Sequence, residues 1–120
     1  MALDSGESSG GGADAAAIAA ALDRMWVKYV PDLRERVCVL DAAARALMAG
    51  ELSDDLRQRA QAAAHKLAGS LGTFGLVQGT ELARRLETRY AAGGLKASDS
   101  AELAAAASEI RSLVEGRKSV

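Results

Sequence analysis

The 120-residue chain contains one histidine, His65, and its imidazole is the side chain best suited to act as a base, a nucleophile or a metal ligand near neutral pH. Apolar residues around it recur at helical spacing. This stripe consists of Leu56, Ala60, Ala63, Leu67 and Leu71. At 100° per residue, His65 lies nearly opposite the stripe, which predicts an exposed imidazole in the middle of a helix.

The predicted surroundings of His65 are unusually bare for an exposed helical face. The positions one and two turns away are Gln61, Ala62, Ala68, Gly69 and Gly72. A glycine inside a helix costs about 1 kcal/mol relative to alanine, so Gly69 indicates that another molecule approaches the backbone beside His65. Lys66 lies 100° further round, where it either offsets phosphate charge or is an ordinary solvated lysine.

Several classes of site are disfavoured by the same residues. One histidine and one cysteine do not make a metal site, and a lone exposed histidine offers neither the pocket nor the orienting carboxylate of a hydrolase triad. The recurring glycines do not follow a strand, which disfavours a nucleotide-binding loop. We therefore expect no metal and no cofactor on this chain.

Composition predicts an all-α protein. Hydrophobic residues make up 49% of the chain, many of them alanine, and aromatic residues only 3%. The net charge of −1 disfavours nucleic-acid binding. The sequence has neither an apolar run long enough for a membrane span nor a secretory signal, so we expect a cytoplasmic location.

Five helical segments are predicted after a Gly/Ser-rich tail. The expected divisions are a disordered tail at 1–12, a helical domain at 13–116 and a polar tail at 117–120. Within the domain the helices span about 13–29, 31–49, 53–72, 76–91 and 98–116, with Pro31 separating the first two. Because the loops are short, the last four helices are expected to form an antiparallel up-down four-helix bundle. The first is expected to be an additional N-terminal helix that packs across one end or side of the bundle. The apolar stripe of this first helix is Ile18, Leu22, Met25, Trp26 and Tyr29.

The segment from Ala64 to Leu76, AHKLAGSLGTFGL, resembles the histidine phosphotransfer (HPt) family, which has an A-H-x-L-K-G pattern and a glycine ten residues after the histidine, here Gly75. The pair Leu86-Glu87 falls where that family has a Leu-Glu pair. The chain departs from the pattern at Ala68, where the family commonly has lysine.

The resemblance implies a non-enzymatic phosphorelay intermediate that accepts a phosphoryl group on His65. It implies a response-regulator receiver domain, a histidine kinase or both as partners, with Mg²⁺ on the receiver and a tight turn at Gly75. We expect a monomer. Arg84, Arg85 and Glu87 are candidate partner contacts beside His65, although each also fits an ordinary solvated face.

Three other functions remain open from the sequence. A module that docks a receiver or kinase without phosphotransfer is motivated by Ala68. The dimerisation domain of a histidine kinase is disfavoured because no proline follows His65 in the expected pattern. A purely structural helical domain leaves Gly69 unexplained.

Overall fold

The computed structural model describes the backbone of residues 2–117 and the side chains of residues 14–117. Four α-helices and one short 3₁₀ turn make up the described chain: α1 (Ala2–Met48), α2 (Asp54–Thr73), α3 (Val77–Ala92), η1 (Ala97–Asp99) and α4 (Ser100–Gly116). No strand is present among these residues, which confirms the all-α prediction.

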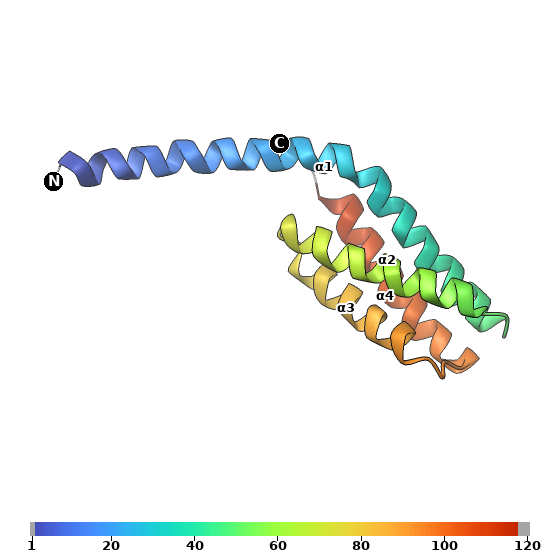
Figure 1. Ribbon diagram of the computed structural model, residues 1–120. Coiled ribbons are helices and arrows are strands. Elements are labelled where there is room, and N and C mark those ends of the chain that lie inside the picture. The colour runs from blue at the N-terminus through green and yellow to red at the C-terminus, as the bar shows by residue number, and fades with distance from the viewer. Residues whose placement is uncertain (1, 118–120) are drawn as a thin grey trace.

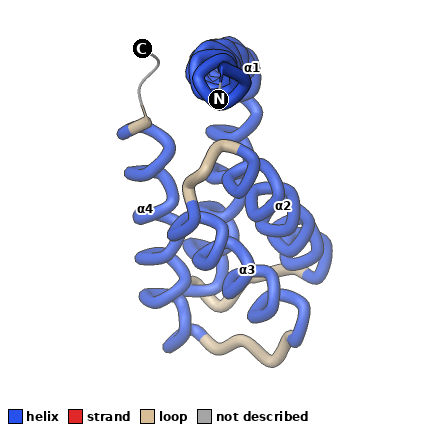
Figure 2. The backbone as a smooth tube through the Cα atoms, turned by 90° about the vertical axis from the view of Figure 1, so that its left-hand side faces the viewer, coloured by secondary structure: helices blue, strands red, loops and turns tan. Residues whose placement is uncertain are grey.

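The bundle consists of the C-terminal half of α1 together with α2, α3 and α4. Successive helices run in opposite directions, and α4 returns to lie along α1 (Figures 1 and 2). Each helix packs against the helices before and after it, and α1 against α4 closes the ring. Apolar faces of the C-terminal half of α1, of α3 and of α4 lie in the core, among them Leu33, Leu86 and Ile110.

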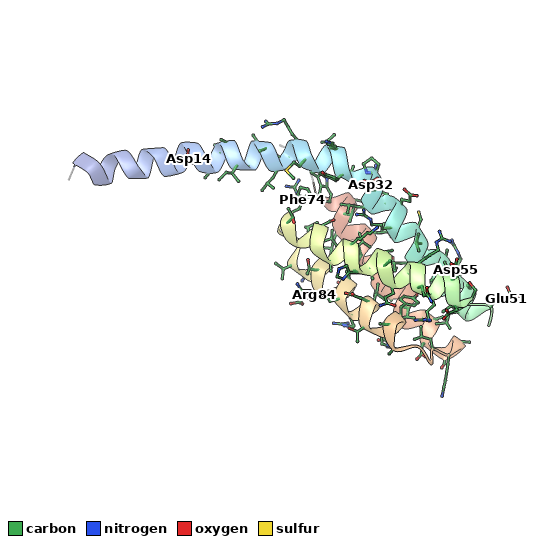
Figure 3. All side chains as sticks on the ribbon, in the orientation of Figure 1. Asp14, Asp32, Glu51, Asp55, Phe74 and Arg84 are labelled. Atoms are coloured by element: carbon green, nitrogen blue, oxygen red, sulfur yellow. The ribbon has the colours of Figure 1, made fainter. Side chains whose placement is uncertain are left out.

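The predicted boundary at Pro31 is wrong, because α1 continues through it. Proline lacks the N–H that would bond the carbonyl of Val27, which bends a helix when the residues beyond it are held by packing. Here Leu33 and Val37 are buried directly after the proline. The helix changes direction close to Asp32 (Figure 3), so the expected separate N-terminal helix is the first half of α1.

This first half of α1 extends beyond the bundle (Figure 1). Of its predicted stripe only Trp26 is buried, whereas Ile18 is 61% exposed and Met25 and Tyr29 are also exposed. The prediction that the first helix packs across the bundle is therefore wrong for most of its length. The backbone of residues 2–12 continues the helix.

Arg117, directly after α4, is held against the bundle. Its guanidinium lies 4.9 Å from the centre of the Trp26 ring and 5.4 Å from that of Phe74, and 3.3 Å from Asp23 Oδ1. Trp26 and Phe74 make an edge-to-face contact at 5.0 Å. The cluster joins α1, the end of α2 and the end of α4. Residues 118–120 of the expected polar tail lie outside the described residues.

Candidate functional site

His65 lies in the middle of α2, a helix whose start is fixed by local sequence. Ser53 is its N-cap and accepts a hydrogen bond from the backbone N–H of Leu56 at 3.1 Å. Ala64 and Leu67, on either side of His65, are buried, whereas the His65 side chain is 74% exposed. The structure thus confirms the exposed mid-helix position expected from the helical spacing.

Glu87 of α3 is the direct partner of His65. Its Oε2 lies 2.8 Å from His65 Nδ1, and the Glu87 side chain is 30% exposed. A carboxylate accepts hydrogen bonds, so this contact favours the tautomer with the proton on Nδ1 and a lone pair on Nε2. Glu87 thus contacts the imidazole within the chain, and its role as a partner contact stays a prediction.

Close packing of α2 and α3 brings Glu87 within reach of His65. A Cβ at Gly79 would lie 2.9 Å from Leu71 Cδ1, so the absence of a side chain at Gly79 lets the helices approach. The buried Thr80 hydroxyl donates a hydrogen bond to the Ala68 carbonyl at 3.1 Å. These contacts fix the spacing of the two helices one to two turns from the His65–Glu87 pair.

An open groove beside His65 brings several of the predicted site residues together. Gln61, Ala62 and Lys66 line it with His65 and Glu87. At its far end the Arg57 guanidinium donates hydrogen bonds to the Tyr90 carbonyl and to Asp54.

Gly69 and Gly72 are exposed on the other side of His65 along α2. A Cβ at Gly69 would meet nothing within 4 Å, so no intramolecular contact requires glycine there. At Gly72 a Cβ would lie 3.4 Å from Thr80 Oγ1.

The prediction that Ala68 belongs to this bare surface is wrong. Its side chain is only 6% exposed, because Ala68 is rotated towards α3 where Thr80 packs. Gly75 has a φ of 77°, which places the α2–α3 turn in the left-handed region and agrees with the tight turn expected there.

The two arginines predicted beside His65 separate in the structure. Arg84 is exposed on α3, three residues before Glu87 and therefore on a similar side of the helix (Figure 3). Arg85 instead lines a groove between α3 and α4 with Arg89 and Glu102. A single step along α3 turns the side chain by 100°, which takes Arg85 away from His65.

Neither a metal cluster nor a membrane span is found in the described part of the chain. It contains no group of three or more histidine, cysteine or acidic side chains placed to hold a metal ion. None of its helices is both long enough and apolar enough to cross a membrane.

Comparison with known proteins identifies the family. The Hpt domain family matches residues 24–116, so the chain belongs to this family. Hpt domains are phosphocarrier modules of two-component phosphorelays and interact with kinases and receiver domains. Protein RcaC of Microchaete diplosiphon is 37% identical over 73 residues, which cover 61% of this chain and 11% of RcaC. No solved structure matches the chain significantly.

Proposed function

We propose that this chain is a phosphorelay intermediate that accepts a phosphoryl group on His65 Nε2 and exchanges it with the aspartate of a response-regulator receiver domain. The observation that best supports this proposal is the exposed imidazole of His65, whose Nδ1 lies against Glu87. A partner reaches Nε2 without any movement of the bundle, and the ring is already oriented before the partner docks.

The transfer step is a nucleophilic displacement at phosphorus. The Nε2 lone pair forms the new N–P bond while the P–O bond to the partner's aspartate breaks, and its electron pair stays on the aspartate carboxylate. The ring gains positive charge as the bond forms. Glu87, which accepts the Nδ1–H hydrogen bond at 2.8 Å, stabilises that charge. The reverse step returns the phosphoryl group to an aspartate.

The partner supplies the rest of the chemistry in this proposal. Mg²⁺ bound by the receiver neutralises the transferring oxygens, and the bundle presents only the nucleophile and a docking surface. Gly69 leaves room beside His65 for a partner backbone or side chain. We propose that the chain acts as a cytoplasmic monomer that exchanges phosphoryl groups with a receiver, a histidine kinase or both.

The second candidate is a module that docks a receiver or kinase without phosphotransfer. It is favoured by the small, buried side chain at Ala68, which puts no cation where the family commonly has lysine. The intact His65–Glu87 pair favours transfer instead.

One assay separates the two candidates. The chain is mixed with an acyl-phosphorylated receiver and Mg²⁺, and protein-bound phosphate that is labile to acid and stable to base is measured, with His65→Gln in parallel. Label on the wild type and none on the variant supports phosphotransfer. Binding of the receiver without label, for a panel of receivers, supports the docking module.

A further inference from the structure

The two nitrogens of the His65 ring face different helices. Nδ1 is bonded to Glu87, which comes from α3. Because the two nitrogens lie on nearly opposite edges of an imidazole, Nε2 faces away from α3. A phosphoryl group on Nε2 therefore lies on the side of α2 that is remote from α3.

Lys66 leaves α2 on this same side. The α3 side of α2 is marked by Ala68, whose carbonyl accepts the Thr80 hydroxyl. Lys66 precedes Ala68 by two residues, or 200° around the helix, and so emerges nearly opposite it. Lys66 is exposed and directly follows His65 in the helix.

The other cationic side chains near the groove either bind other groups or lie on the α3 side of His65. The Arg57 guanidinium is 2.6 Å from the Tyr90 carbonyl and 2.8 Å from Asp54 Oδ1. Arg84 is on α3, the side that Nδ1 faces. The Lys66 ammonium has no ion-pair partner among the described side chains, and its long flexible stem lets it reach a group on the adjacent residue.

We propose that Lys66 Nζ binds the phosphoryl group carried by His65 Nε2 and is the cation of this chain that stabilises the phosphorylated state. A phosphoryl group brings a charge of about −1.5 to −2, which the neighbouring Gln61, Ala62 and Gly69 do not balance. The inference rests on the proposed function, since it requires phosphorylation of His65.

The test measures the ionisation of the phosphoryl group itself. The full chain is phosphorylated chemically with phosphoramidate, and the ³¹P chemical shift is titrated in the wild type, Lys66→Ala, Lys66→Arg and the control Lys96→Ala. Lys96 is an exposed lysine before η1. A nearby cation lowers the pKa of the phosphoryl group, so Lys66→Ala raises that pKa by about 0.5, as expected for charges several ångströms apart near water. Lys66→Arg and Lys96→Ala leave it near the wild-type value.

Each outcome decides a separate point. A phosphoryl pKa that is the same in Lys66→Ala and the wild type, with phosphate on His65 in both, overturns the role of Lys66 and leaves the proposed function standing. Failure of His65 to take phosphate from both phosphoramidate and a phosphorylated receiver overturns the proposed function itself. Lys66 is exposed, so circular dichroism is expected to show the same helix content in all four proteins.

Discussion

His65 Nδ1 lies 2.8 Å from Glu87 Oε2, and this contact joins two helices that are adjacent in the bundle. It fixes the ring by one edge and leaves the other edge to solvent, because the His65 side chain is 74% exposed while Glu87 is half-buried. Glu87 thus holds Nδ1 in place, and Nε2 is the nitrogen left to react.

Removal of the Glu87 carboxylate is expected to slow phosphotransfer while the fold and receiver affinity stay unchanged. Without its acceptor the ring samples other orientations and tautomers, so Glu87→Ala lowers the transfer rate by roughly 10- to 100-fold. Glu87→Gln keeps an acceptor oxygen but loses the charge and retains an intermediate rate. Stopped-flow transfer kinetics with a fixed receiver measure both, and Glu81→Ala, an exposed acid on α3, is the control. Equal rates in Glu87→Ala and Glu81→Ala would show that the contact has no positioning role.

Substitution of Gly69 is expected to raise the stability of the helix while it lowers the affinity for the partner. Nothing lies within 4 Å of a Cβ at this position, so Gly69→Gln folds and gains up to about 1 kcal/mol in helix stability. The added side chain occupies the surface where the partner docks, and receiver affinity falls by about tenfold or more. Calorimetric titration with a receiver measures this loss against Gly116→Gln, whose site at the end of α4 is equally open. Unchanged affinity would mean that the partner does not cover Gly69.

Tyr90 carries a buried hydroxyl without a hydrogen-bond partner among the described residues, and its side chain is 1% exposed. Tyr90→Phe is therefore expected to preserve stability or raise it by about 1 kcal/mol. Burial raises the pKa of the Tyr90 phenol to about 12, against about 10 in the unfolded chain. Wild-type stability consequently falls as the pH rises from 10 towards 12, since only the unfolded state releases the proton there.

The pH dependence of Tyr90 is checked by urea unfolding at pH 8 and pH 11. The loss of stability between these values is expected to be smaller in Tyr90→Phe than in the wild type. Tyr29→Phe, which changes an exposed tyrosine, keeps the wild-type loss. The same loss in all three proteins would show that the Tyr90 hydroxyl is solvated or bonded in solution.

The first half of α1 is expected to contribute little to the stability of the bundle. Ile18 is 61% exposed, so Ile18→Ser changes the free energy of unfolding by less than about 0.5 kcal/mol. Ile110 is fully buried, and Ile110→Ala costs about 2–5 kcal/mol. Thermal unfolding of the two variants measures the contrast. A loss above about 1.5 kcal/mol in Ile18→Ser would place this residue against the core in solution.

Periodicity predicts the bundle well where apolar stripes are strong and ends are capped. The N-cap at Ser53 and the buried faces of α3 and α4 follow from local sequence. Two features did not follow. The continuity of α1 through Pro31 depends on packing of the residues after the proline. The exposure of Ile18 depends on the absence of a packing partner for this part of α1 among the described residues.

The position of His65 was predictable because spacing along one helix determines which face a residue occupies. Its pairing with Glu87 was not, because it depends on how α2 and α3 pack, and that spacing is set by Gly79 and Thr80. The predicted positions of Ala68 and Arg85 were wrong for the same reason. Each lies at the edge of its helical face, where the location of the neighbouring helix decides between burial and exposure.

In the proposed phosphorylated state His65 Nε2 carries the phosphoryl group while Nδ1 stays against Glu87, and the position of the N–P bond tests this most directly. Long-range ¹H–¹⁵N correlation spectra of the ¹⁵N-labelled chain, recorded before and after transfer from a phosphorylated receiver, distinguish the two ring nitrogens. We predict that phosphorylation changes Nε2 into the substituted nitrogen and leaves the proton on Nδ1. Phosphate on Nδ1, or on a residue other than His65, would contradict this account.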